Sequence, residues 1–327
     1  MTNVKPLASL SLDLDNEWSY LKAHADPTWT EYPSYLNLAI PRILSVLEEC
    51  DLKITFFIVG TDASFEKNRD VLSSLVKEGH EIGNHSFKHE PWLHRYSESE
   101  FDDELKKAEE AIERATGVRP RGFRGPGYSM YNHALKALSS RGYLYDSSTM
   151  PTFVGPLART YFFLKSSFDD EQKQERKLLF GSVRDGLRPL KPYHWKTNNS
   201  TFLELPLTTF PFFRLPFHVS YVLYLSTFSS TAATLYWRSA LRMCRLGGVE
   251  PNLLLHPLDF LGKDDVGSLA FFPGMNLSSG LKLERVRGYL EDLKENHRVL
   301  SLNKYAEFVS LRNNLGTRSP DFQQAQR

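Results

Sequence analysis

The sequence has few of the features that mark disulfide-linked or nucleic-acid-binding proteins. Its two cysteines, Cys50 and Cys244, are isolated and lack metal-type spacing, so we expect buried thiols in a reducing compartment. The 40 basic and 39 acidic side chains leave a net charge of +1, and no basic run is long enough to follow a phosphate backbone. Nucleic acid is therefore not an expected partner.

Long apolar segments and targeting signals are also scarce. Residues 1–10 contain no apolar region of the kind a signal peptide needs, so we expect a cytoplasmic protein. A location at the inner face of the membrane is compatible with this expectation. The least polar long window, residues 210–228, is interrupted by Arg214, His218 and two prolines and falls short of a spanning helix. Its aromatic side chains favour burial, but peripheral contact with a membrane surface or a lipid stays open.

The composition is that of a globular protein with a substantial core, because 41% of the 327 residues are hydrophobic and 24% are charged. Residues 7–14 alternate apolar and polar positions, as a strand does, and residues 54–59 are apolar on both faces, as in a buried parallel strand. Apolar periodicity predicts helices that begin near Pro41, over residues 101–115 with Gly117 as its end, and over 281–293. Further strands are predicted at 80–83, 143–146, 202–206, 253–255 and 299–302, and further helices at 71–76, 133–140 and 304–311.

Repeated strand–helix–strand units predict an α/β fold with a parallel sheet, either open or closed into a barrel. The rhythm breaks after Pro151, and we interpret residues 151–200 as an insertion that shapes a substrate cleft. No repeat or linker divides the chain, so residues 1–312 are expected to form one domain. The polar, aperiodic residues 313–327 are predicted to be a disordered tail.

Reactive side chains fall at the ends of the predicted strands. In a parallel barrel the carboxyl ends of all strands face one way, so groups far apart in the sequence converge there. The residues in such positions are Asp13 and Asp15 after the first strand, His85 and His89 after the third, Arg124 in the fourth loop, and His256 after a late strand.

These residue types indicate a metal-dependent hydrolase. His85 and His89, four residues apart, point the same way if the chain between them makes one helical turn. With Asp15 they would form a two-histidine, one-carboxylate site with open positions for a metal that activates water. Asp13 could then act as a base held by Arg124, and His256 could protonate a leaving group.

The same motifs resemble those of the polysaccharide deacetylase family, carbohydrate esterase family 4 with its NodB homology domain. The matching elements are Asp-x-Asp at residues 13–15, His-Ser with a second histidine at 85–89, Arg-x-Pro followed by tyrosine at 124–128, and an apolar run that ends in His-Pro at 256–257. The resemblance extends over roughly residues 7–310 in the family's order.

The resemblance implies a distorted (β/α) barrel of about seven parallel strands and metal-dependent hydrolysis of an N-acyl group. It implies zinc as the metal, with Asp15, His85 and His89 as ligands. By the same resemblance, the catalytic residues are Asp13 as general base, Arg124 as the group that orients it, His256 as general acid, and Tyr128, whose backbone N–H helps to hold the oxyanion.

The sequence departs from the family pattern at three places. Leu14 separates the two aspartates, and Gly127 adds a residue before Tyr128, which puts the oxyanion donor in doubt. The family's Asp-x-x-x-Trp motif, whose carboxylate tunes the acid histidine, is missing, and the sequence leaves open whether Asp259 or Asp146 replaces it. It also leaves open whether Glu204 points into the barrel or out to solvent.

The predicted activity is therefore hydrolysis of a linear amide, the removal of an N-acyl group, in the expected case acetyl, from an amino sugar in a polysaccharide or a lipid-linked glycan. An alternative is a metal-dependent hydrolase of a small cyclic imide or another non-sugar amide on the same scaffold. A third is a catalytically inactive barrel that binds without turnover. The oligomeric state cannot be read from the sequence.

Overall fold

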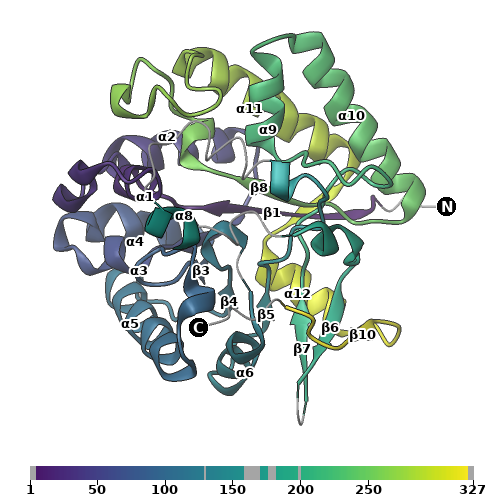
Figure 1. The fold of residues 1–327 in the computed structure, drawn as a ribbon. Helices are drawn as coiled ribbons and strands as arrows, with labels where there is room; N and C mark the ends of the chain where they lie inside the picture. Colours follow the sequence, from purple (N-terminus) through teal and green to yellow (C-terminus); the bar gives the residue numbers. More distant parts are fainter. Residues whose placement is uncertain (1–4, 129, 158–169, 176–181, 198–199, 323–327) are drawn as a thin grey trace.

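A mostly parallel ten-stranded sheet organises the fold of this computed structural model, which describes residues 5–128, 130–157, 170–175, 182–197 and 200–322 (Figure 1). The strand order is β10-β6-β7-β5-β4-β3-β2-β1-β8, and β9 pairs with the start of β1. The strands are β1 (Leu7–Asp13), β2 (Thr55–Ile58), β3 (Glu81–Asn84), β4 (Gly122–Phe123), β5 (Tyr145–Asp146), β6 (Tyr193–Lys196), β7 (Thr201–Glu204), β8 (Asn252–Leu255), β9 (Arg298–Leu300) and β10 (Gly316–Arg318).

The sheet curls into a distorted barrel, as predicted. Strands β1 to β5, β7 and β8 are parallel to one another, close to the predicted number of about seven, and β9 adds a further parallel partner to β1. No ladder joins β7 to β8 in the described chain; instead the N–H of Thr208 donates to the carbonyl of Asn252 (3.0 Å), and the N–H of Asn252 donates to Thr208 Oγ1 (2.8 Å). A short loop thus closes the ring.

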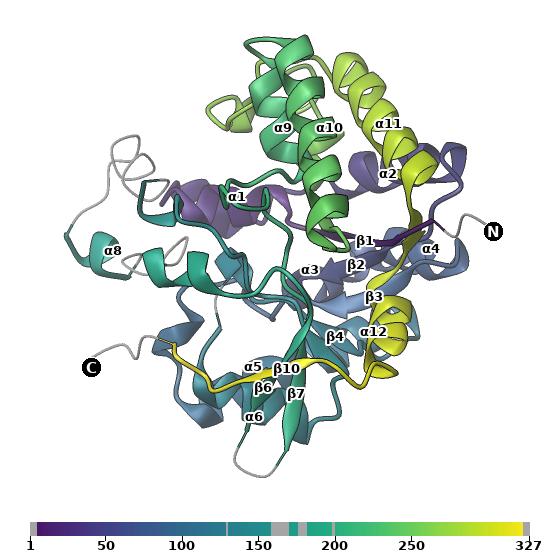
Figure 2. The same ribbon diagram turned by 90° about the vertical axis from the view of Figure 1, so that its right-hand side faces the viewer.

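Helices cover the sheet on both sides. In Figures 1 and 2, α9, α10 and α11 lie above β1, whereas α5 and α6 lie on the opposite side. The helices are α1 (Glu17–Ala23), α2 (Leu36–Glu49), α3 (Gly60–Ser64), α4 (Arg69–Lys77), α5 (Glu98–Thr116), α6 (Asn132–Ser140), α8 (Asp170–Glu175), α9 (Val219–Ser226), α10 (Ser230–Gly247), α11 (Ser279–Asn296) and α12 (Leu302–Ser310), and 3-10 turns include η4 (Pro126–Tyr128) and η6 (Pro257–Asp259). Among the described residues, no helix is long and apolar enough to cross a membrane.

The alternation along β1 explains how the barrel places polar groups inside. Leu10 and Leu12 are fully buried in the main apolar cluster, against the covering helices. Ser11 and Asp13 are also buried and, by the period of two, point to the other face of the strand. The interior of the barrel at the end of β1 is therefore polar.

The predicted helices are present, with one shifted start. Helix α5 has the expected caps, a reciprocal Ser97–Glu100 capping box at its beginning and Gly117 at φ 75° after its end. Helix α2, however, begins at Leu36, so Pro41 lies inside the helix and not in its first turn. Pro41 predicts the wrong N-terminus for this helix because the true first turn has no capping side chain that would identify it in the sequence.

Two segments outside the regular β/α units add edge strands. The described part of the predicted insertion contains β6, which pairs antiparallel with β7; residues 158–169, 176–181 and 198–199 lie outside the described chain. β10 pairs with β6, so the prediction of a disordered tail is wrong for residues 316–318. Pairing with an open sheet edge orders this polar segment, which apolar periodicity could not reveal. Residues 323–327 lie outside the described chain.

Candidate active site

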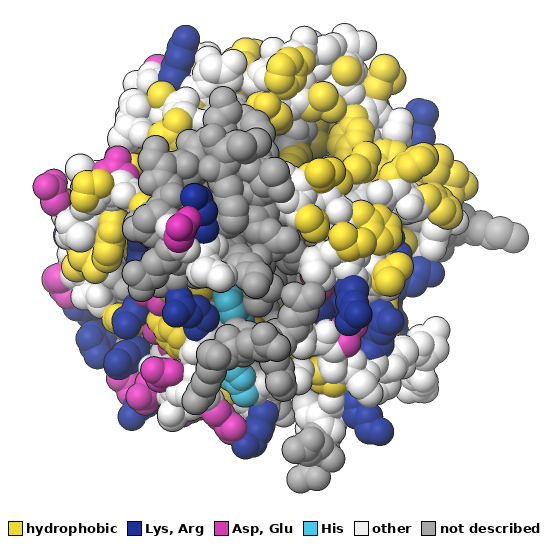
Figure 3. Space-filling model, viewed as in Figure 1, with side chains coloured by type: hydrophobic (Ala, Val, Ile, Leu, Met, Phe, Trp, Pro, Cys, Tyr) yellow, Lys and Arg dark blue, Asp and Glu magenta, His cyan; other side chains and the backbone are white. Residues whose placement is uncertain are grey.

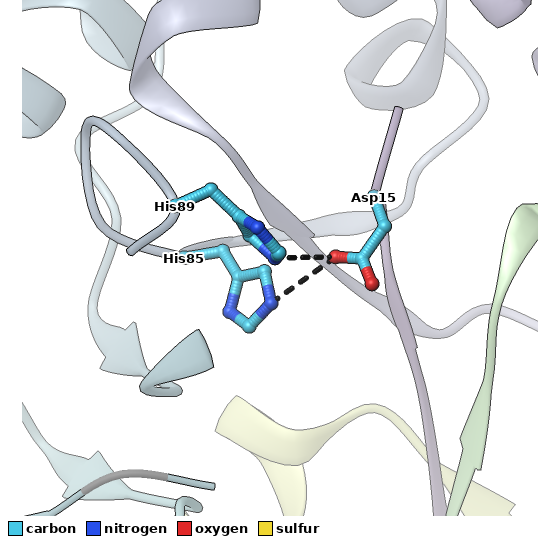
Figure 4. A group of neighbouring side chains, drawn as sticks. All are labelled: Asp15, His85 and His89. Carbon is cyan, nitrogen blue, oxygen red and sulfur yellow. Dashed lines mark ion pairs between the residues drawn. The ribbon is translucent and has the colours of Figure 1, made fainter. Parts of the chain in front are cut away.

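The two histidines and Asp15 converge at the carboxyl edge of the barrel (Figure 4). His85 Nε2 lies 3.3 Å and His89 Nε2 2.9 Å from Asp15 Oδ1, and one ligand atom from each residue lies within 4.8 Å of the others. Asp13 stands just behind, with Oδ2 3.9 Å from His85 Nε2. The structure thus brings together the four residues that the sequence placed after the first and third strands.

The loop that carries the histidines is not the helical turn that we expected. Ser86 and His89 have positive φ angles of 61° and 52°, in the left-handed region. The loop is held by side chains instead: Ser86 Oγ accepts the N–H of His89 (3.1 Å), and Glu104 Oε1 accepts those of Phe87 (2.9 Å) and Lys88 (2.6 Å). Glu104 comes from α5, so tertiary contacts rather than local helix formation aim the two imidazoles.

The three side chains fit a divalent metal such as zinc. His85 Nδ1 lies 2.7 Å from the carbonyl of Arg124, which fixes the ring with its N–H there and its Nε2 lone pair toward the cluster. Asp15 Oδ1 and His89 Nε2 are buried and make no hydrogen bond with the described chain. Ligand atoms about 2 Å from a tetrahedral zinc ion lie about 3.3 Å apart, close to the spacing seen here.

Electrostatics tie the cluster together. Burial favours a raised pKa for Asp15, but the close approach of His89 and His85 outweighs it and holds the pKa well below its usual range. For His85, Asp13 and Asp15 likewise overcome burial and raise the pKa, whereas burial lowers that of His89.

Arg124 is fully buried and connects Asp13 to the barrel wall. Its Nη1 donates to Asp13 Oδ1 (2.6 Å) and to Ser11 Oγ (2.8 Å). Its Nε and Nη2 donate to the carbonyl and the hydroxyl of Ser147, both at 2.9 Å. The expected contact with Asp13 is present, but it involves one nitrogen and not the two of a bidentate fork, because the rest of the guanidinium is engaged by β1 and the chain after β5.

The backbone of Tyr128 does not point a free N–H at the site. Gly127 and Tyr128 both have φ near 60°, and the N–H of Tyr128 donates to the carbonyl of Gly125 at 3.1 Å inside η4. The extra glycine allows this tight turn. The oxyanion donor predicted from the resemblance is thus already engaged, and the ring of Tyr128 packs beside Met150, Leu207 and Leu254.

His256 lies at the end of β8, where Ser220 and Asp259 orient it. Ser220 Oγ is 2.9 Å from His256 Nδ1, and Asp259 Oδ2 accepts the backbone N–H of His256 at 2.8 Å. Burial raises the pKa of Asp259 against the opposing charge of His256. Of the two carboxylates left open by the sequence, Asp259 is therefore the one connected to His256.

Asp146 belongs to a different group. It faces Glu204 across the β5–β7 ladder, and Glu204, which is fully buried and not exposed to solvent, accepts from Thr149 Oγ1 (2.7 Å) and Trp195 Nε1 (2.8 Å). Burial and the adjacent Glu204 charge raise the pKa of Asp146 well above its usual range. Asp146 also accepts from Ser148, whose hydroxyl accepts the N–H of Gly125, so this pair supports the loop that carries Arg124.

Four further residues shape the site, and the sequence motifs do not predict them: Glu104, His218, Ser220 and Tyr221. The last three lie at the start of α9, inside the window that its hydrophobicity marked for burial or lipid contact. A histidine directly before a helix in such an apolar window was the signal available.

A mostly parallel α/β barrel with an Asp-His-His cluster at its carboxyl edge defines the class: a barrel with a candidate metal centre. In comparisons with known proteins, residues 28–145 match the family model "Polysaccharide deacetylase". The match includes His85, His89, Arg124 and Tyr128 and excludes Asp13, Asp15 and His256. The resemblance of the chain to the polysaccharide deacetylase family is thereby confirmed.

Individual relatives agree with the family model. The chain is 33% identical over 104 residues to a peptidoglycan-N-acetylglucosamine deacetylase of Bacillus cereus, and this alignment covers 32% of this chain and 37% of the relative. It is 32% identical over 114 residues to a peptidoglycan deacetylase of Helicobacter pylori, over 35% and 38% of the two chains. The chain thus spans less than half the length of these curated relatives.

A solved structure from Mycobacterium smegmatis, described as a candidate polysaccharide deacetylase, matches the whole fold. The alignment covers 100% of this chain and 97% of the other, with a TM-score of 0.64 and 20% identity. At that identity the match supports the barrel architecture alone.

Proposed function

We propose that this protein is a metal-dependent hydrolase that removes an N-acyl group, acetyl in the expected case, from an amino sugar in a polysaccharide or a lipid-linked glycan. The observation that carries the proposal is the convergence of the Asp15, His85 and His89 ligand atoms beside an Asp13–Arg124 pair in one buried edge of the barrel. The named relatives and the family match support the same reaction class. We take residues 1–312 as the catalytic unit.

Asp15, His85 and His89 would hold the metal, for which zinc is the proposed identity. When bound, the metal would act as a Lewis acid that polarises the acyl oxygen and lowers the pKa of water. The ligand set supports this because it combines two imidazole nitrogens with one carboxylate and leaves positions open for water and substrate.

Asp13 would take the proton of the attacking water. Its carboxylate makes a hydrogen bond with Arg124 through Oδ1, while Oδ2 faces the ligand histidine His85. Arg124 fixes the direction of that carboxylate because its other donors are anchored on Ser11 and Ser147. A base held in this way needs no rearrangement before the reaction.

His256 would give a proton to the leaving amine. If the Nδ1–H of His256 donates to Ser220 Oγ, then Nε2 is left for the substrate. Asp259, which accepts the backbone N–H of His256, would stabilise the imidazolium form by its charge. By resemblance, this is the role of the family's missing Asp-x-x-x-Trp carboxylate.

Exposed aromatic side chains support a large or lipid-linked substrate. Phe212 (73% exposed), Phe213 (67%) and Phe228 (73%) lie in the window of residues 210–228. In Figure 3 hydrophobic side chains gather at the upper right of the face, over α9 and α10. Peripheral contact of this surface with a membrane remains part of the proposal.

The test is release of acetate by the purified protein from N-acetylglucosamine oligomers, from lipid-linked N-acetyl sugars and, in parallel, ring opening of cyclic imides. Asp13→Asn protein serves as the control for contaminating activity. Hydrolysis of an N-acetyl sugar by the wild type alone supports the proposal. Turnover of a cyclic imide only would favour the second activity, and no turnover with zinc supplied would favour an inactive barrel.

A further inference from the structure

His218 is a buried histidine without a hydrogen-bond partner. Its side chain is 6% exposed, and neither Nδ1 nor Nε2 has a partner within the described chain. Buried imidazoles are normally hydrogen-bonded, and an unpaired one requires an explanation. Other buried histidines here follow the rule: His80 Nδ1, for example, accepts the N–H of Ile54 at 3.2 Å.

The position of His218 places it inside the candidate active site. It is the residue directly before α9, and its ring centroid lies 5.7 Å from that of His256. Burial, followed by the positive charges of His256 and Arg124, lowers its pKa well below the usual value. His218 thus lies close enough to His256 and Arg124 for their charges to affect its pKa.

The surroundings of His218 describe what could bind it. A neutral imidazole offers one N–H donor and one lone pair, which suits a group that both accepts and donates, such as a hydroxyl. Tyr221, one turn further along α9, packs its ring 4.4 Å from that of His218 and is 36% exposed. An aromatic face beside a polar group matches the two sides of a sugar ring, its C–H face and its hydroxyls.

We propose that His218 is a substrate-binding residue whose neutral imidazole hydrogen-bonds a hydroxyl of the amino sugar while the sugar lies against Tyr221. The inference rests on the proposed function and deepens it, because a cyclic imide has no hydroxyl to satisfy this histidine. It also explains why the ring is unpaired: its partner is the substrate.

The experiment compares His218→Phe, which keeps a ring but removes both polar atoms, with His218→Asn, which keeps a donor and an acceptor. On the N-acetylglucosamine oligomer that the wild type hydrolyses, His218→Phe should raise KM about 10- to 100-fold with little change in kcat, since a lost hydrogen bond to a buried group has this size. His218→Asn should stay within about threefold of the wild type. Metal content should equal that of the wild type in both.

His80→Phe is the matched control, because it removes a buried histidine that has a partner at the other end of the barrel. It should lower Tm and leave KM unchanged. His218→Phe should not lower Tm, since it removes polar atoms that are unpaired in the free protein. A fall in Tm together with an unchanged KM for His218→Phe would make His218 a structural residue and overturn the inference.

Binding separates this inference from the proposed function. Calorimetric titration of Asp13→Asn protein with an N-acetylglucosamine tetramer measures affinity without turnover, and adding His218→Phe should weaken it by the same factor as KM. Equal affinity in the two proteins, or no binding to either, overturns the role of His218. If the tetramer binds through His218 but no N-acetyl sugar is hydrolysed by the wild type, the proposed reaction fails and the binding role stands.

Discussion

The two sides of the candidate site are built in different ways. On the metal side, each residue contacts another member of the group, as in the pairs Asp15–His85 and Asp13–Arg124. Ser11 and Ser147 accept hydrogen bonds from Arg124, and Glu104 accepts one from the loop that carries the histidines. On the α9 side, His256 has one side-chain partner, Ser220, and the neighbouring His218 has none within the described chain.

This difference distinguishes preorganisation from recognition. A group that handles charge in the reaction must be held in place before the substrate arrives, which the dense contacts of the metal side achieve. A group that recognises the substrate must instead leave a donor or acceptor unused. The sparse contacts at the start of α9 fit the second task, so removing one side chain from each side should have different consequences.

The largest effect is expected from removing a ligand on the metal side. His89→Ala and His85→Ala should lose the bound metal and, with it, all measurable turnover, because two donors hold a divalent ion far more weakly than three. Metal analysis of the purified proteins measures this directly. His94→Ala should keep wild-type metal content, since His94 lies outside the cluster; loss of metal from that variant alone would show that the ligands are misassigned.

Substitutions of Asp13 and Asp15, both on the metal side, should have different effects on turnover and on metal content. Asp13→Asn keeps the ligands and removes the proton acceptor, so turnover should fall by about 10²–10⁴-fold while metal occupancy stays near that of the wild type. Asp15→Asn replaces an anionic ligand with a neutral amide, so metal should be lost and part of the activity should return with excess zinc. Rate and metal content over a zinc titration decide the matter, and zinc rescue of Asp13→Asn alone would mean that the roles are exchanged.

The sequence predicted the metal side because its signals are local. Asp13, Asp15 and His85 stand within two positions of a predicted strand, and parallel strands bring their carboxyl ends together whatever lies between them. The conformation of the 85–89 loop was not predictable in the same way. It depends on Glu104, a residue of the following helix whose acidic side chain looks from the sequence like any solvent-facing position of α5.

The α9 side could not be predicted for a related reason. The apolar composition of residues 210–228 predicts burial or lipid contact and gives no indication of a catalytic role. Helix α9 begins at Val219 without a capping side chain that would mark its start. The contact between Ser220 and His256 joins two chain segments that no short motif spans. Only the fold reveals that His218 and Ser220 lie beside His256.

An intermediate effect is expected from Ser220 on the α9 side. Ser220→Ala leaves His256 Nδ1 without its partner, so kcat should fall about tenfold with unchanged metal content, and Ser220→Thr should restore most of it. Ser226→Ala on the same helix is the control, because Ser226 bonds Arg285 and the carbonyl of Leu223 and not His256. Equal rates for Ser220→Ala and Ser226→Ala would remove Ser220 from the mechanism.

A change in stability, and not in turnover, is expected at Asp62, which contacts the chain segment directly after Asp15. Asp62 is buried, and its Oδ1 accepts hydrogen bonds from Asn16 Nδ2 (2.7 Å) and Trp18 Nε1 (3.0 Å). Both residues lie in the segment directly after the proposed metal ligand Asp15. Burial raises the pKa of Asp62 to about 7, while Oδ2 has no partner in the described chain.

The folded protein therefore keeps a proton on Asp62 at pH values where the unfolded chain, with a pKa near 4, has released it. The stabilisation is fully present below about pH 4 and is lost as the pH rises through about 7. Asp62→Asn is neutral and keeps an oxygen for Asn16 and Trp18, so it should abolish this dependence. The free energy of unfolding of the variant minus that of the wild type should rise by at most about 4 kcal/mol between pH 4.5 and pH 8. Denaturant titrations at both pH values measure the difference, and curves that stay parallel would mean that Asp62 is ionised in the folded state.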